Sequence, residues 1–231
     1  MPRSIELRPR REVLEEVNRK IGEKCPWFCP IVDERELGLH SKREIEIVGV
    51  TQVIADLWHA FAHVQFVTIQ PDGSIKPYTV RIDKPSALVY AVINEKLLLS
   101  YQSRLAIGTK WTLELPRGWI TPHDATSPES AVRALLTREC GSVFVASLDS
   151  FKPVEVKRIW QDTGTMRSDL PVYYLEAKTT QVLLERQGLC KPKLFGFDEV
   201  EAVEENGKLS DAFSLAGLRV VERYLQRTVR L

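Results

Sequence analysis

The chain has 231 residues, of which 44% are hydrophobic and 27% charged, with a formal net charge of +1. This balance is typical of one large globular domain or of one domain with an extension, and it excludes the basic footprint of a nucleic-acid-binding protein. No apolar run reaches the roughly 18 residues that a membrane helix needs. Residues 1–17 are charged throughout and lack the apolar core of a signal peptide. We therefore expect a cytoplasmic protein without nucleic-acid or membrane partners.

The first 83 residues predict a helix followed by strands. Residues 6–22 carry apolar side chains at helical spacing and end near Gly22. Residues 45–54 and 78–82 are typical of strands. Residues 57–69 are ambiguous, because their first half suits a helix and their second half a strand. We treat residues 1–83 as an N-terminal extension of helix and strands.

The pattern changes after residue 83. Residues 86–103 predict two strands joined in a hairpin at Asn94 and Glu95. We then expect a strand ended by a Pro-Arg-Gly turn at 111–119, a helix at 127–140, and two strand-like segments at 144–160 and 170–180. A short strand with a helix follows at 194–207, and a last helix capped by Ser210 at 210–229. This mixture of helices and largely antiparallel strands predicts an α+β fold.

The segment SPESAVRALLTRECG, residues 127–141, has the features of a capped amphipathic helix. Ser127 is a good N-cap, and Pro128 suits the first helical position. Val132 and Leu136 lie four residues apart and can face a core, and Gly141 ends the helix. On these residues alone, a plain core helix is a sufficient interpretation.

The surrounding motifs indicate more than a core helix. LELPRG at 113–118, SPESA at 127–131 and ECG at 139–141 follow one another as strand, turn, loop and helix. This order resembles the Nudix box of the Nudix hydrolase superfamily, most closely the branch that cleaves ADP-ribose and related nucleoside diphosphate sugars. The resemblance covers about residues 84–231, including the QSR that ends the first hairpin.

The resemblance carries several implications. It implies a Nudix-type α/β/α sandwich with a mixed sheet for residues 84–231, and a small phosphorylated or nucleotide-like ligand. The resembled branch dimerises through its N-terminal strands, which implies a homodimer with residues 1–83 as dimerisation or partner surface. The family also implies Mg²⁺, held by carboxylates at i, i+3 and i+4 on one helix face.

The metal-binding positions of this box are mostly replaced. When the helix is aligned on Gly141, the three carboxylate positions hold Leu135, Arg138 and Glu139, and the acidic position in the preceding loop holds Thr126. One carboxylate is a poor Mg²⁺ site, and loss of the metal removes several kcal/mol of charge stabilisation. We therefore expect a protein without standard Mg²⁺-dependent hydrolysis, whose cleft binds a ligand or serves another chemistry.

The candidate site residues follow from this alignment. Glu139 is the candidate metal ligand and, with Glu114 of LELPRG, the candidate catalytic pair. Candidate ligand-binding residues, which offer guanidinium groups for phosphate oxygens or an indole for stacking on a base, are Arg104, Trp111, Arg117 and Arg138. The alternatives are an Arg138–Glu139 salt bridge or a solvated Arg138, a solvated Arg104, and packing of Trp111 in a core.

Two other patterns carry competing chemistry. Cys25 and Cys29 together with His59 and His63 could be four zinc ligands if the histidines share a helix face, and otherwise they are packing residues. Cys140 is either a nucleophile or a helix-end cysteine in the core.

Two other functions remain open besides ligand binding. An active hydrolase of ADP-ribose or nucleoside diphosphate sugars would need acidic residues from outside the box, such as Glu114 and Glu185, to complete the metal site. A non-catalytic scaffold would use the fold only for interaction.

Overall fold

The structure is a computed structural model that describes residues 10–23, 25, 46–55, 61–69, 72–104, 109–121, 123–160, 166–167, 169–183 and 190–228. The chain divides into two compact units. The first comprises Met1–Pro85 and Trp160–Asp169, and the second comprises Ser86–Ile159 and Leu170–Leu231. Within the described residues, no helix is both long and apolar enough to cross a membrane.

The first unit is a small sheet with one helix. Its elements are α1 (Arg10–Gly22), β1 (Glu46–Ala55), β2 (Phe61–Ile69), β3 (Ile75–Asp83) and β9 (Met166–Arg167). The strand order is β1-β2-β3-β9, with β9 parallel to β3 and the other pairs antiparallel. The expected helical stripe is present, because Val13, Val17 and Ile21 of α1 are fully buried in one cluster with residues of β2.

The second unit is built on a seven-stranded mixed sheet of order β11-β5-β4-β10-β8, in which β6 pairs with β5 and β7 with β4. Its strands are β4 (Ser86–Ile93), β5 (Lys96–Arg104), β6 (Thr109–Glu114), β7 (Arg117–Trp119), β8 (Val154–Trp160), β10 (Asp169–Ala177) and β11 (Cys190–Phe195). Its helices are η3 (Asp124–Thr126), α2 (Pro128–Cys140), α3 (Ser142–Ala146), α4 (Phe197–Glu205) and α5 (Ala212–Thr228).

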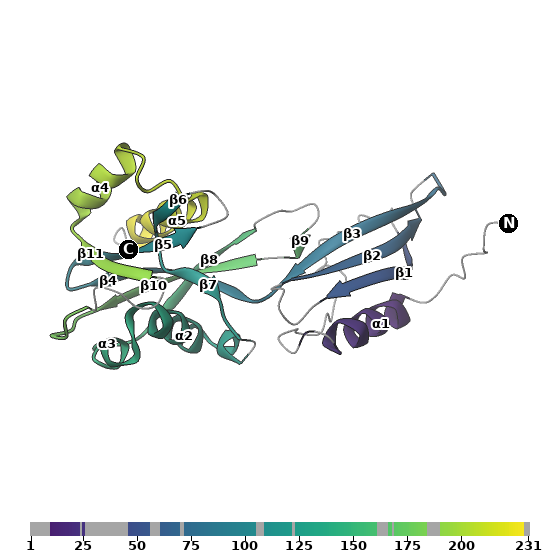
Figure 1. Cartoon of the computed structure of the whole chain (residues 1–231), viewed down its shortest axis with the longest axis horizontal. Coiled ribbons are helices and arrows are strands. Elements are labelled where there is room, and N and C mark those ends of the chain that lie inside the picture. Colours follow the sequence, from purple (N-terminus) through teal and green to yellow (C-terminus); the bar gives the residue numbers. More distant parts are fainter. Residues whose placement is uncertain are drawn as a thin grey trace. The chain divides into compact units, whose positions relative to one another are not determined.

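Helices cover both faces of this sheet (Figure 1). Every residue of β4 is buried, as expected for a strand between two layers. Its odd-numbered residues, such as Val89 and Ala91, belong to the core with α2 and α3. Its even-numbered residues, such as Leu88 and Tyr90, belong to the core with α4 and α5. The α+β class and the α/β/α layering expected from the sequence are therefore confirmed.

The turn that joins β4 to β5 also agrees with the sequence. Asn94 and Glu95 have φ values of 51° and 63°, which a two-residue hairpin loop requires. Asn94 fixes the turn further, since its side-chain amide exchanges hydrogen bonds with the backbone of Thr179 at 2.8 and 3.0 Å.

Two local predictions were wrong. The start of the 144–160 segment was expected to be a strand, but Ser142–Ala146 form α3. Tertiary packing overrides the local strand preference, because Phe144 and Val145 are buried in the same core as α2. The last helix is capped by Asp211 and not by Ser210, since Asp211 Oδ2 accepts hydrogen bonds of 2.8 Å from the backbone N–H and the hydroxyl of Ser214.

Candidate functional site

The helix α2 places the box residues in the second unit. Ser127 caps it by accepting a hydrogen bond from the Ser130 N–H at 3.1 Å, as expected. The helix ends at Gly141, which has a φ of 90°. A residue with a side chain is strained at that φ, so glycine suits the sharp connection from α2 to α3.

The three box positions on α2 have three different environments. Leu135 is fully buried among the apolar residues between α2 and the sheet. Glu139, one turn later, is 1% exposed. Arg138 is exposed. The first position therefore serves the core, the second faces solvent, and only the third holds a buried carboxylate.

The Arg138 side chain lies against β7, the short strand that follows Pro116. Its Nη1 donates a hydrogen bond of 2.5 Å to the backbone carbonyl of Trp119. A Cβ added to Gly118 would overlap Arg138 Nη2, so the absence of a side chain at Gly118 makes room for the guanidinium group. In the described part of the chain, Arg138 has no carboxylate partner. The alternative of an Arg138–Glu139 salt bridge is therefore not realised.

A row of polar side chains lies on the sheet face toward α2. Ser100 and Gln102 follow Leu98 at two-residue steps along β5, so they share the sheet face of Leu98, which belongs to the α2 core. Gln102 Nε2 donates to Ser100 Oγ at 3.2 Å, and the Cys190 thiol donates to Gln102 Oε1 at 3.2 Å. Ser100 also stands opposite Glu114 in the β5–β6 pair, which places Glu114 in this row.

Sequence reasoning did not select Ser100, Gln102 or Cys190 as site residues. Gln102 could have been selected from the sequence, because it begins the QSR motif. Ser100 and Cys190 carried no signal, since their place beside Gln102 depends on the pairing of β5 with β6 and β11.

Glu114 belongs to a network that joins the β6–β7 turn to α5. The carboxylate is 2% exposed and accepts a hydrogen bond of 2.5 Å from Thr112 Oγ1. Arg117 Nη2 lies 3.5 Å from Glu114 Oε2 and 3.3 Å from Asp211 Oδ1. The Arg117 guanidinium also stacks over the Phe213 ring at 4.5 Å. Arg117 thus has two carboxylates to neutralise its charge and an aromatic ring to hold its plane.

Burial and the charge of the Glu139 carboxylate raise the pKa values of the two nearby thiols, Cys140 and Cys190. Burial first, and Glu139 second, raise the pKa of Cys140. The same two causes raise the pKa of Cys190, against a smaller lowering by its hydrogen bond to Gln102 and by the charge of Arg138. A protonated, buried thiol is a poor nucleophile, so Cys140 serves as a core residue.

The remaining candidates lie apart from Glu139 or outside the described side chains. Lys191 stands opposite Tyr101, which packs against the α5 core, and its Nζ lies 4.2 Å from the centroid of the Trp111 ring. This contact places Trp111 on the α5 face of the sheet, away from Ser100 and Gln102. Arg104 ends β5, but its side chain is outside the described part, as is all of Glu185.

The four-ligand zinc hypothesis required His59 and His63 to share one face of a helix, and the structure does not support that requirement. His63 lies on β2, so spacing to His59 does not place two rings on one helix face. Cys25 is described and 1% exposed, whereas Cys29 and His59 lie outside the described residues.

Comparison with known proteins supports the fold. Neither a protein-family model nor a curated protein sequence matches the chain. Among solved structures, an "ADP compounds hydrolase" crystal structure is similar, with a TM-score of 0.60 and 14% sequence identity over 81% of this chain and 97% of that one. At this identity the likeness concerns the fold alone. The second unit therefore has the α/β/α sandwich fold that the motifs implied.

Proposed function

We propose that this protein binds a small phosphorylated, nucleotide-like ligand beside α2 without the standard Mg²⁺-dependent hydrolysis of the resembled family. The observation that supports this most directly is the contrast between Leu135 and Arg138. One carboxylate position of the box is filled by a fully buried leucine, and the next by an exposed arginine without a carboxylate partner in the described part of the chain.

The side chains around Glu139 do not fit Mg²⁺. The ion prefers near-octahedral oxygen coordination and usually takes more than one carboxylate from a protein. Among the described residues, no three His, Cys, Asp or Glu side chains form a group that could hold a metal. Glu114, the other buried candidate carboxylate, already interacts with Thr112 and Arg117. We therefore assign no step to a metal ion.

Arg138 is the group that we assign to phosphate recognition. Its hydrogen bond to the Trp119 carbonyl uses one of five N–H donors and holds the guanidinium at the edge of β7. The remaining donors can pair with phosphate oxygens through a planar fork, which makes charge-assisted bonds roughly twice as strong as neutral ones. Arg117 has a structural role in this proposal, because Glu114 and Asp211 neutralise its charge.

Calorimetric titration with ADP-ribose in EDTA tests this assignment. Loss of a charge-assisted hydrogen bond costs about 1.5–3 kcal/mol, so Arg138→Ala should weaken binding about 10- to 150-fold. Arg138→Lys, which keeps the charge but not the fork, should weaken it less. Arg133→Ala is the matched control, because it removes an exposed arginine of the same helix that pairs with Glu129. Equal affinity of the Arg138→Ala and Arg133→Ala variants would refute the assignment.

An active hydrolase is the second candidate. It is favoured by the burial of two carboxylates, Glu139 and Glu114, at 1% and 2% exposure. Glu114 lies in the polar row that faces α2, the helix that carries Glu139. This candidate requires further ligands from the substrate or from residues such as Glu185, and it predicts turnover that depends on Glu139.

A further inference from the structure

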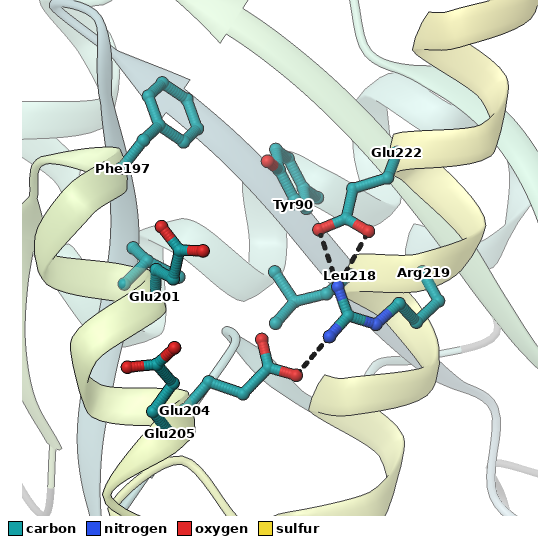
Figure 2. Close-up of a pocket in the computed structure, with 9 residues that line it drawn as sticks. Tyr90, Phe197, Glu201, Glu204, Glu205, Leu218, Arg219 and Glu222 are labelled. Carbon is teal, nitrogen blue, oxygen red and sulfur yellow. Dashed lines mark hydrogen bonds and ion pairs between the residues drawn. The ribbon is translucent and has the colours of Figure 1, made fainter.

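A cavity of about 570 Å³ lies between α4 and α5, on the sheet face opposite to α2. Figure 2 shows its lining side chains, which come from both helices and from Tyr90 of β4. The volume is within the range of small-molecule sites. Four glutamates and one arginine line it, so its lining is strongly acidic although the whole chain is almost neutral.

Half of these carboxylates have no counter-charge. Arg219 pairs with Glu222 at 2.9 Å and with Glu204, and so occupies both of them. Glu201 and Glu205 are exposed and, within the described residues, neither is in an ion pair. They lie four residues apart on α4, where like charges destabilise a helix. A positive charge bound in the cavity would relieve that repulsion.

Tyr90 supplies an independent polar group. The residue is 4% exposed, yet its hydroxyl has no hydrogen-bond partner among the described residues. In Figure 2 this hydroxyl points into the space between Phe197 and Glu222. The hydroxyl oxygen is open to the cavity, so a ligand bound there can take the hydrogen bond that no described side chain makes. Burial, with the charge of Glu222, raises the pKa of Tyr90 to about 12, which keeps the phenol neutral.

An exposed aromatic ring completes the cavity. Phe197, the first residue of α4, is 51% exposed at its rim. Aromatic faces attract ammonium groups and pack against methylene chains. The carboxylates do not form a group that could hold a metal, so the charge suits an extended organic cation better than a metal ion. A phosphorylated ligand would be repelled by the same charges.

We propose that this cavity binds a small organic cation of the polyamine class, with its ammonium groups at Glu201 and Glu205, its methylene chain against Phe197 and a hydrogen bond to the Tyr90 hydroxyl. The site is independent of the proposed phosphate site, because the two lie on opposite faces of the sheet. Either site can fail its test without affecting the other.

The test is calorimetric titration of the full chain with spermidine, at low and at physiological salt. The variant Glu201→Gln/Glu205→Gln should weaken binding about tenfold, given the usual strength of partly exposed ion pairs. Phe197→Ala should weaken it about two- to fivefold, and Tyr90→Phe should also weaken it while keeping the ring. Asp198→Asn is the matched control, because it removes an exposed charge from α4 at a residue that does not line the cavity.

The outcomes separate a built site from general charge attraction. Affinity that falls in the Glu201→Gln/Glu205→Gln and Tyr90→Phe variants but stays within twofold of wild type in Asp198→Asn supports the site. An equal loss in the double variant and in Asp198→Asn would mean attraction to the helix as a whole, and would overturn it. No heat of binding with the wild-type chain, or equal binding of Mg²⁺ at the same residues, would also overturn it.

Discussion

The sharpest test of the α2 assignment is to put a carboxylate back at the first box position. Leu135→Glu restores the residue type of an intact box at that position. If Leu135 faced a metal site, the substitution would be tolerated, and Mg²⁺ would stabilise the variant. Because Leu135 is fully buried among Leu136, Val132 and the sheet residues, we expect a large loss of stability instead.

The expected loss can be estimated from the burial of this side chain. Removing a fully buried leucine from the core loses about 1.5–3 kcal/mol of transfer free energy. Burying a protonated carboxyl group without a partner costs about 1–3 kcal/mol more. Together these give about 2.5–6 kcal/mol, a large part of the 5–15 kcal/mol that stabilises a typical domain. Leu135→Met, which nearly conserves volume, should cost less than about 1.5 kcal/mol.

Urea denaturation of both variants, with and without Mg²⁺, is the assay. The variant Leu135→Glu should also lose stability as pH rises above the unfolded carboxyl pKa of about 4.3. Burial raises the pKa of this carboxyl group in the folded state. Between the unfolded and the folded pKa, the unfolded state loses its proton more readily, so the free energy of unfolding falls as pH rises. A loss below about 1 kcal/mol, or a Mg²⁺-dependent gain in stability, would refute the placement of Leu135 in the core.

Four further predictions follow from particular contacts. Gly217→Ala should lose about 1–3 kcal/mol of stability in thermal unfolding, because its Cβ would overlap Leu88, whereas Gly22→Ala, with open space, should not. In an ultraviolet pH titration Tyr90 should ionise near pH 12. Because its folded pKa is raised above the unfolded value of about 10, the stability that this group contributes is lost between about pH 10 and 12. The variant Tyr90→Phe should remove both the ionisation and this loss of stability. Cys140, buried with a raised pKa, should resist alkylation at pH 8 until the protein unfolds, as read by mass spectrometry. We also expect a homodimer through the N-terminal strands in light scattering with size exclusion, and a monomer at all concentrations would contradict it.

Features governed by local sequence were predictable. Ser127 and Gly141 bound α2 because capping needs only residues within one turn. The β4–β5 turn followed from its place between two apolar runs and from Asn94, a residue type that tolerates positive φ. Glu139 was placed in the site by its position in the motif, and its burial is what an inward-facing helix position requires.

Features set by tertiary contacts were not predictable. The role of Arg117 depends on Asp211, 94 residues later, whose approach no local pattern encodes. The placement of Trp160–Asp169 with the first unit depends on the pairing of β9 with β3. The acidic cavity arises only because α4 and α5 bring Glu201, Glu205 and Glu222 around Tyr90. Each of these glutamates alone has the pattern of an ordinary solvated helix residue.

Metal-dependent hydrolysis tests the central claim most directly. The wild-type chain and Glu139→Gln would be incubated with ADP-ribose and a panel of nucleoside diphosphate sugars, with Mg²⁺ or Mn²⁺, and phosphomonoester products counted. We predict no turnover by either protein, together with ligand-induced thermal stabilisation that persists in EDTA. Turnover by the wild-type chain that Glu139→Gln abolishes would contradict the account, because it would mean that other ligands complete a working metal site around Glu139.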